Sequence, residues 1–194
     1  MLVYSKDKSG FLGDVRANRV HGEILAATRQ QSFHSVSDSE ISSWRNSLQF
    51  LGNVLADDDI PPEVQVSIEY RIPLTNKRVD VIVSGKNSEA RLAAVVIELK
   101  QWSKVAKTEK DGTVRTFLGG SEREALHPSY QAWSYVQTIR DFNNAVQENS
   151  IELAPCAFLH NLDDPRTIND IFYKEHTDRA PVFISSDSER LARF

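Results

Sequence analysis

The sequence lacks the features that define several large classes of protein. It contains one cysteine, Cys156, among 194 residues, which excludes an internal disulfide and a zinc site built from cysteines alone. No apolar run approaches the roughly 20 residues that a membrane-spanning helix requires. Charged residues occupy the N-terminal positions that would be apolar in a signal peptide. We therefore expect a cytoplasmic protein that does not associate with a membrane.

The charge balance also excludes a uniformly basic surface. Lys and Arg number 23 and Asp and Glu number 27, which gives a formal net charge of −4. An acidic chain can still act on nucleic acid if its basic residues are concentrated locally and divalent cations offset the phosphate charge. The five histidines show no helical or finger-like ligand spacing. The length suits one domain of ordinary globular composition.

The pattern of apolar residues predicts an α/β fold. Ser37 and Glu40 form a capping-box pattern, and apolar residues then recur at steps of three and four. Short links between the first three β-prone runs indicate an antiparallel meander. We therefore expect a mixed central sheet of four or five strands flanked by helices. The expected helices cover residues 16–30, 37–55 and 129–147, and the expected strands cover residues 64–72, 78–84, 93–102, 151–160 and 182–184.

The polar segment from residue 103 to residue 128 is long for a loop without structure of its own. Asp111-Gly112 stands between two β-prone stretches and predicts the turn of a small hairpin. Gly119-Gly120 predicts a mobile joint, and His127-Pro128 predicts the entry to the next helix.

Two of the expected strands carry charged residues among apolar ones. Asp80 interrupts one strand, and Glu98 and Lys100 end the next. Side chains alternate along a strand, so Glu98 and Lys100 project from the same face. If the two strands are neighbours, the three groups converge, and two carboxylates in contact attract a hard divalent cation. The alternative is a structural ion pair at the end of the sheet, which seldom stabilises a fold.

These residues resemble a known family. Asp80 followed by Glu98-Leu99-Lys100 resembles the signature of the PD-(D/E)XK nucleases. Gln131 and Tyr135 resemble the QxxxY motif of the RecB-type members, and residues four apart share one face of a helix. Val79 stands where the family has a proline, at a position that varies within the superfamily.

The resemblance covers roughly residues 37 to 161 and implies both a fold and an activity. The implied fold is a restriction-endonuclease-like αβββαβ core, and the implied activity is metal-dependent hydrolysis of phosphodiester bonds. Asp80, Glu98 and the Leu99 carbonyl would hold Mg²⁺, or Mn²⁺, while Lys100 would assist the attacking water and the transition state. Gln131 and Tyr135 would orient the scissile phosphate or a water.

Many of these nucleases use one further acid from the first core helix. Glu40 is the candidate for this metal ligand, although its position in the capping box explains it fully. Glu23, on an earlier helix, is an equal competitor whose ordinary explanation is a solvated helix face. Glu69, on the first expected strand, is a third possibility whose ordinary explanation is an exposed, alternating strand position.

Basic residues after the third strand form a candidate nucleic-acid-binding arm. They are Lys104, Lys107, Lys110 and Arg115, and they could contact phosphates. A solvated polar stretch is the alternative. Trp102 either stacks on a base or covers the core. The RecB-type resemblance implies DNA rather than RNA.

The expected organisation has three segments. Residues 1–36 form a helical extension packed on the core, residues 37–185 form the nuclease-like domain, and residues 186–194 begin a connection to a downstream domain. Strings such as Glu98-Leu99-Lys100-Gln101-Trp102 resemble a bacterial family in which such a domain precedes a P-loop helicase-like domain. The sequence has no GxxxxGK[ST] motif of its own. The alternative function is a catalytically silent module of the same fold that binds nucleic acid or a partner.

Overall fold

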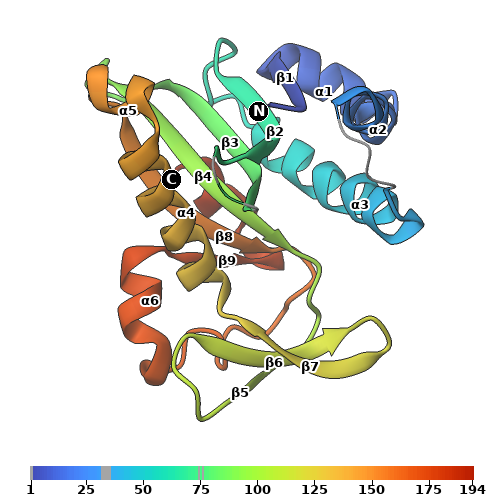
Figure 1. Ribbon diagram of the computed structural model, residues 1–194, viewed down its shortest axis with the longest axis vertical. Helices are drawn as coiled ribbons and strands as arrows, with labels where there is room; N and C mark the ends of the chain where they lie inside the picture. The colour runs from blue at the N-terminus through green and yellow to red at the C-terminus, as the bar shows by residue number, and fades with distance from the viewer. Residues whose placement is uncertain (1, 32–35, 74, 76) are drawn as a thin grey trace.

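The computed structural model describes residues 2–31, 36–73, 75 and 77–194. Met1 and residues 32–35 of the expected N-terminal extension lie outside the described residues. Helices flank a large mixed sheet, and a smaller sheet projects from one end of it (Figure 1). None of the helices in the described segments combines the length and apolar composition that a membrane crossing requires.

The large sheet has six strands in the order β1-β2-β3-β4-β8-β9. The three pairs β1–β2, β2–β3 and β3–β4 are antiparallel, while β8 runs parallel to β4 and β9 runs parallel to β8. The predicted meander and the mixed sheet are confirmed, but the expected number of four or five strands was too small. The strands are β1 (Tyr4–Asp7), β2 (Gln65–Arg71), β3 (Arg78–Lys86), β4 (Leu92–Lys100), β8 (Glu152–Leu159) and β9 (Val182–Ile184).

Seven α-helices are present in the described part of the chain. They are α1 (Lys8–Arg16), α2 (Val20–Gln31), α3 (Asp38–Leu55), α4 (Pro128–Phe142), α5 (Asn144–Glu148), α6 (Lys174–Arg179) and α7 (Ser188–Ala192). The capping box predicted for α3 is confirmed, because the Ser37 side chain accepts from the Glu40 N–H and the Glu40 side chain accepts from the Ser37 N–H. Two short 3₁₀ turns complete the set at Ile171–Tyr173 and Ser185–Asp187.

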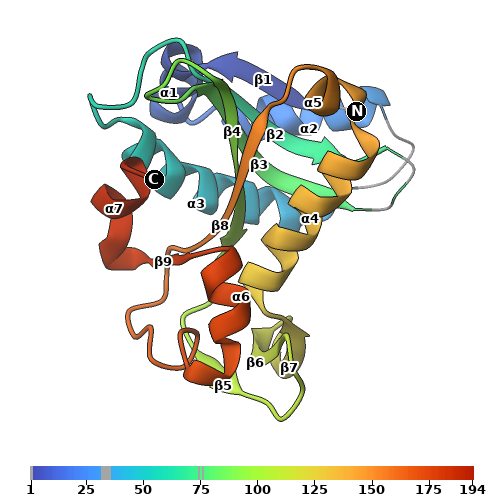
Figure 2. The same ribbon diagram turned by 90° about the vertical axis from the view of Figure 1, so that its left-hand side faces the viewer.

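The sheet is covered on both faces (Figure 2). The apolar stripe of α3, which includes Trp44, Leu48 and Leu51, packs in one core cluster with Ile97 of β4. On the opposite face, apolar residues of α4 pack against Val96, the neighbouring residue of the same strand. The continuous apolar run of β4 therefore serves both layers, as expected for a central strand.

The N-terminal segment contributes more than the helices expected for residues 1–36. It adds β1 at the edge of the large sheet, and it contains two helices, of which α1 was not predicted. Asp7 caps α1, since its side chain accepts from the Gly10 N–H at 2.7 Å. A Cβ atom on Gly52 of α3 would lie 2.8 Å from a methyl carbon of Val15, so this glycine permits the close packing of α1 on α3.

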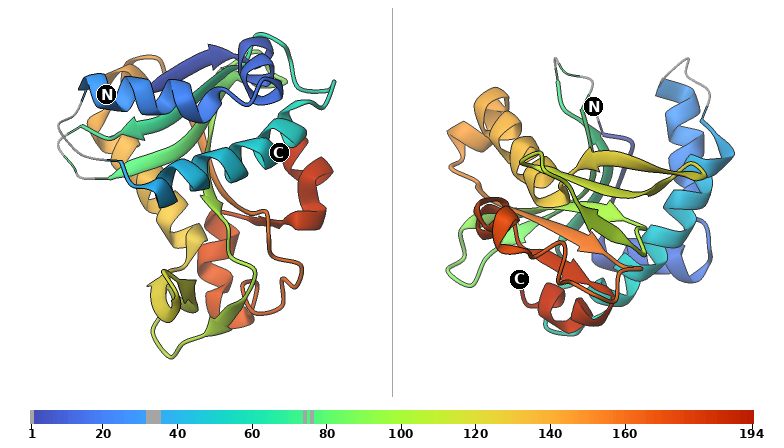
Figure 3. Two further views of the ribbon diagram at one scale, coloured as in Figure 1. Left: turned by 90° about the vertical axis from the view of Figure 1, so that its right-hand side faces the viewer. Right: turned by 90° about the horizontal axis from the view of Figure 1, so that it is seen from below.

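The smaller sheet lies beyond the end of β4, in the segment between β4 and α4 (Figure 3). It consists of β5 (Val105–Lys107), β6 (Thr113–Leu118) and β7 (Ser121–Leu126). The predicted hairpin turn at Asp111-Gly112 is confirmed between β5 and β6. Gly119 and Gly120, where we expected a mobile joint, both have positive φ and form the tight turn of a second hairpin, and their mobility stays a prediction.

The helix expected over residues 129–147 is divided at Asn143. This residue has extended backbone angles, and its side chain accepts from the Val146 N–H at 3.3 Å to begin α5. The local hydrogen bonding of an asparagine side chain therefore ends one helix and starts another, which the apolar periodicity did not indicate.

The two ends of β4 provide a test of which residues form the core. Ile97 is 3% exposed and lies in the cluster with α3, whereas Leu92 is 43% exposed at the start of the same strand. We expect Ile97→Ala to lower the free energy of unfolding by about 2–5 kcal/mol because it leaves a cavity in a packed core. Leu92→Ala, the matched control, should cost less than about 1 kcal/mol. Denaturant titrations would measure both, and equal losses would contradict this assignment of the core.

Candidate functional site

The register of the central strands places the charged residues of β3 and β4 together. Val81 pairs with Ile97 at the end of an antiparallel ladder, and Asp80 and Glu98 are the residues that directly adjoin this last pair. Ile97 points toward α3, and the alternation of side chains turns Glu98 toward α4. The convergence that the sequence predicted for neighbouring strands is therefore present.

Hydrogen bonds hold these groups in place. The Leu99 N–H donates to Asp80 Oδ2 at 2.8 Å, which fixes the aspartate across the two strands. Lys100 Nζ donates to Glu98 Oε1 at 2.6 Å. Glu98 is 2% exposed, so this ion pair lies in the interior at the end of the sheet.

The first half of α4 contributes two further side chains. Gln131 Nε2 donates to Glu98 Oε1 at 2.7 Å and to the Tyr135 hydroxyl oxygen at 2.8 Å. The spacing of four residues places both on the helix face that covers β4. The structure therefore brings together all five residues for which the resemblance implied catalytic roles.

The burial of two adjoining carboxyl groups changes their acidity. Burial, and then the neighbouring Asp80, raise the pKa of Glu98 to about 8, although Lys100 opposes the shift. Burial likewise raises the pKa of Asp80 against the opposing effects of Lys100 and the Leu99 N–H. Burial disfavours the Lys100 ammonium, but Glu98 and Asp80 outweigh it and raise the pKa of this lysine. Near neutral pH the two carboxyl groups therefore retain a proton beside a charged ammonium.

The second oxygen of Glu98 remains without a partner. Glu98 Oε2 is buried and accepts no hydrogen bond from any residue that the structure describes. The proton that the pair retains near neutral pH can satisfy this oxygen, and a cation between Asp80 and Glu98 would satisfy it once that proton is released. The described residues contain no cluster of three or more His, Cys, Asp or Glu that could hold a metal ion. Two carboxylates nevertheless fit Mg²⁺, which usually keeps several waters and takes further oxygens from a substrate phosphate.

A cleft of about 850 Å³ opens above these groups. Gln101 and Trp102 extend the floor of the cleft beyond the end of β4. The rest of the floor is formed by the five residues with implied catalytic roles, which are Asp80, Glu98, Lys100, Gln131 and Tyr135. One wall carries hydroxyl groups from α3, and the other wall comes from the β6–β7 hairpin. The wall residues are Ser39, Ser42 and Ser43 on the first side and Phe117, Leu118 and Gly119 on the second.

Two cations at the rim of the cleft were not among the predicted site residues. Lys77 and Arg78 both line it at the start of β3. Two acidic residues hold the Arg78 side chain in place. Its Nε lies 2.5 Å from Glu69 Oε2, and its Nη2 donates to Glu40 Oε1 at 3.1 Å. The serine wall was also missed, although hydroxyl side chains spaced three and four residues apart on a predicted helix indicated a polar face.

The three candidates for an additional acid differ in position. Glu40 accepts hydrogen bonds from Ser37 and from Arg78, which help to lower its pKa against the effect of burial, and it does not line the cleft. Glu23 is exposed on α2 and does not line the cleft. The structure therefore gives Glu40 a capping and ion-pairing role, and its role as a metal ligand stays a prediction.

Glu69 is the position where the expectation was wrong. It is 4% exposed rather than solvated, and its φ of 58° places it in the left-handed region within β2. Trp44 Nε1 donates to Glu69 Oε1 at 2.6 Å. Burial raises the pKa of Glu69 to about 7, against the opposing effects of Arg78 and Trp44. A backbone distortion inside a strand cannot be recognised from side-chain alternation, which assumes regular geometry.

The candidate nucleic-acid-binding arm lies on the smaller sheet. Lys107 Nζ is 2.7 Å from Asp170, and Lys110 Nζ is 2.6 Å from Glu124, so each is paired with an acid at the surface. Lys104 and Arg115 are exposed.

Four further side chains that could take part in binding or catalysis lie in the interior: Trp102, His127, His160 and Cys156. Trp102 is buried in the core between the two sheets, with Lys100 Nζ 5.3 Å from its ring centroid. His127 caps α4 and its Nε2 lies 2.9 Å from the Ile168 carbonyl oxygen, and the buried His160 stacks on Phe50. Cys156 is fully buried, and burial raises the pKa of its thiol.

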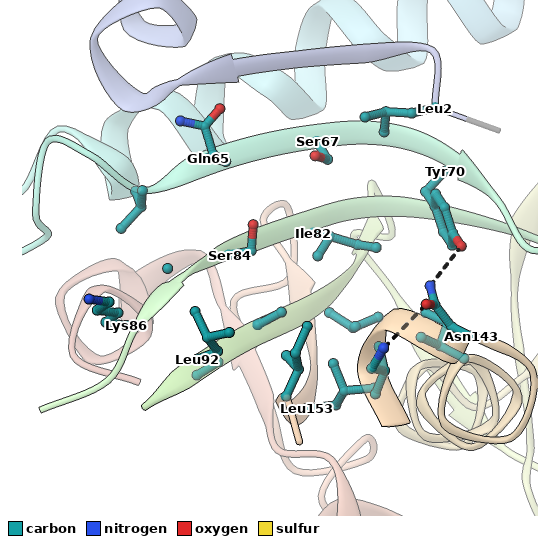
Figure 4. A pocket seen from close by; sticks show the side chains of 18 of the residues that line it. Leu2, Gln65, Ser67, Tyr70, Ile82, Ser84, Lys86, Leu92, Asn143 and Leu153 are labelled. Carbon is teal, nitrogen blue, oxygen red and sulfur yellow. Dashed lines mark hydrogen bonds between the residues drawn. The ribbon is translucent and has the colours of Figure 1, made fainter. Parts of the chain in front are cut away.

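A second hollow of about 630 Å³ lies on the α4 side of the sheet, toward α5 (Figure 4). Apolar residues such as Ile82, Leu92 and Leu153 line much of it, and Asn143 bonds to the Tyr70 hydroxyl oxygen at one side. Its charged lining residues are Glu63 and Lys86. It has no convergent set of titratable groups, so the cleft over Asp80 and Glu98 is the better candidate for chemistry.

The raised pKa of Glu98 predicts a specific pH dependence of stability. Between the ordinary pKa of a glutamate and about 8, the folded chain holds a proton that the unfolded chain has released, so stability falls as the pH rises through this range. Glu69 contributes in the same direction up to about pH 7. We expect Glu98→Gln to lose less stability than the wild type as the pH rises from the ordinary pKa of a glutamate to about 8.

Denaturant titrations at a series of pH values would measure this effect. Glu148→Gln is the control, since Glu148 is exposed at the end of α5. Identical pH profiles for the wild type and Glu98→Gln would show that the buried carboxyl pair does not titrate as described.

Comparison of the chain with family models, with curated proteins and with solved structures finds no match in any of the three. The geometry of the cleft and the sequence motifs that form it are therefore the basis on which a function is assigned.

Proposed function

We propose that this chain is a metal-dependent nuclease domain with a restriction-endonuclease-like core. The observation that carries the proposal is the convergence of Asp80, Glu98 and Lys100 at the end of two adjacent strands, in a cleft with cations at its rim. The chain order α3-β2-β3-β4-α4-β8 supports an αβββαβ core. The position of Gln131 and Tyr135 against Glu98 supports placement in the RecB-type branch.

Asp80, Glu98 and the Leu99 carbonyl would hold a divalent cation, Mg²⁺ or Mn²⁺. Such a cation lowers the pKa of an attacking water and stabilises charge on the phosphate oxygens. Its binding requires the carboxyl pair to release the proton that it retains near neutral pH, so affinity for the cation should rise with pH through about 8.

Lys100 has the position of a group that stabilises charge in the transition state. Its ammonium points into the cleft and is held by Glu98 at 2.6 Å, and its raised pKa keeps it charged. Such a preorganised charge acts most strongly where water is excluded. Gln131 is held by Glu98 and Tyr135 and would orient a phosphate oxygen or a water through its amide group.

The cations of the cleft give the site a preference for an anionic substrate. Lys77 and Arg78 line it, in a chain whose formal net charge is −4, whereas the charge of Lys100 is already paired with Glu98. Nucleic acid is the substrate class that this arrangement suits, and the RecB-type resemblance favours DNA. The separate resemblance of Glu98-Leu99-Lys100-Gln101-Trp102 to a bacterial family with a P-loop domain supports a helicase-like partner domain downstream.

The second candidate is a catalytically silent module of the same fold that binds nucleic acid or a partner. One observation favours it. Lys100 and Gln131 both donate to Glu98 Oε1, so this oxygen already has its hydrogen-bond partners within the protein and does not need a metal ion. The cleavage experiment below distinguishes the two.

We first expect Mg²⁺ or Mn²⁺ to raise the melting temperature, because the cation binds the folded chain and not the unfolded one. The shift should be larger above pH 8 than near pH 6.5, where the carboxyl pair retains its proton. Thermal scans with and without metal would measure it. Asp80→Asn should abolish the shift, and Asp141→Asn, an exposed change on α4, should leave it intact. An undiminished shift in Asp80→Asn would place the metal elsewhere.

Cleavage of labelled DNA and RNA with Mg²⁺ or Mn²⁺ is the direct test of the proposed function. We expect Lys100→Ala to slow cleavage by about 10²–10³-fold while binding without metal changes little, because its role is confined to the transition state. Gln131→Ala should be intermediate. Lys86→Ala, at an exposed position at the end of β3, is the control. If the wild type binds DNA but no metal supports cleavage of any substrate, the silent module is the correct function.

The four residues of the basic arm should contribute unequally to the affinity for DNA. Replacing Lys104 and Arg115 by Ala should weaken DNA binding and lower the salt slope by about one unit per lost contact. Replacing Lys107 and Lys110 should have a smaller effect, since each is already paired with an acid. Binding isotherms over a range of salt concentrations would measure both pairs. Equal, negligible effects would remove the arm from the binding surface.

A further inference from the structure

An exposed aromatic ring forms part of the wall of the candidate cleft. Phe117 is 64% exposed, although it lies within a regular strand of the smaller sheet. Along β6, Val114 and Thr116 point inward and are buried, while Arg115 and Phe117 point outward. The ring therefore projects away from the apolar core of its own sheet and lines the cleft with Lys100.

The backbone around Phe117 is fixed. Leu118 pairs with Ser121 across the turn formed by the two glycines, so Phe117 lies one residue before the end of a tight hairpin. The Thr116 hydroxyl donates to the Lys104 carbonyl at 2.8 Å, which ties β6 to the segment that leaves β4. A ring on such a support is presented to the cleft without first having to be ordered, which lowers the entropic cost of binding.

The rest of the cleft indicates what this ring would contact. Lys77 and Arg78 supply positive charge at the rim, and Ser39, Ser42 and Ser43 of α3 also line the cleft. A ligand that complements these features has an anionic group for the cations and a flat, apolar face for the ring. A nucleotide within a chain has both.

We propose that Phe117 stacks on the nucleobase next to the phosphate held in the candidate site, and that it thereby selects unpaired strands. The proposal rests on the nucleic-acid substrate of the proposed function and adds the residue that distinguishes an unpaired base from a paired one. Aromatic side chains stack on bases of any sequence, so the selection concerns strandedness rather than sequence. In an intact duplex both faces of a base are covered by its neighbours, so a protein ring can stack only on a base that has left the helix.

The test uses the full chain without metal and measures binding of a labelled single-stranded oligothymidylate and of a duplex of the same length. We expect Phe117→Ala to weaken binding of the single strand by about tenfold or more and to change duplex binding little. Phe117→Trp should retain or strengthen single-strand binding, because the indole also stacks. Phe142→Ala is the matched control, since Phe142 is 58% exposed on α4 and does not line the cleft.

A second readout separates stacking from a structural role of Phe117. Single abasic sites moved along the oligonucleotide should weaken binding to the wild type most at one position, and Phe117→Ala should lose that positional effect. Melting temperatures of the variants should match that of the wild type, because the ring is exposed. Equal single-strand affinities of the wild type and Phe117→Ala, or a loss that is the same for duplex and single strand, would overturn the proposal.

The same measurements distinguish this proposal from the nuclease activity. If no metal supports cleavage but single-strand binding depends on Phe117, stacking holds and the nuclease assignment fails. If the wild type cleaves single strands and Phe117→Ala cleaves and binds them equally well, the nuclease assignment holds and stacking fails. A wild type that binds no nucleic acid overturns the proposal.

Discussion

The pairing of Asp80 with Glu98 across β3 and β4 is the constraint on which the site depends. Two carboxyl groups side by side in the interior of a protein are unfavourable, and the fold compensates them with Lys100, the Leu99 N–H and Gln131. The compensation is incomplete, because one oxygen of Glu98 lacks a hydrogen-bond donor and its pKa is raised to about 8. A buried carboxyl pair whose pKa is raised and whose charge is only partly compensated is better explained by binding or chemistry than by a structural role.

Much of the large sheet could be predicted because its strands follow simple rules. The apolar run of β4 and the short links of the β2–β3–β4 meander were recognised from the sequence. The edge strand β1 was not, since a short strand among polar residues lacks a periodic signal. The division between α4 and α5 depends on the side chain of Asn143 rather than on apolar spacing, so a periodicity argument extends the helix through it.

The floor of the cleft was predictable and its walls were not. Charged residues inside apolar strands indicated Asp80 and Glu98, and the resemblance to the QxxxY motif indicated Gln131, because each signal lies within one element. The walls come from α3 and from the β6–β7 hairpin, and no local rule indicates that these segments meet over β4. Glu69 was misjudged for a related reason, since its left-handed backbone breaks the alternation that placed it at the surface.

The smaller sheet is attached to the site at both of its ends. The chain leaves β4 at Lys100 to form it and returns at His127, only four residues before Gln131. The buried Trp102 fixes the departing segment, and the contact of His127 with the Ile168 carbonyl fixes the returning one. Trp102 and His127 lie close in sequence to Lys100 and Gln131, which hold Glu98. The position of the hairpin that carries Phe117 is therefore fixed relative to the floor of the cleft. The same insertion thus builds a wall of the cleft and limits how far that wall can move relative to the carboxyl pair.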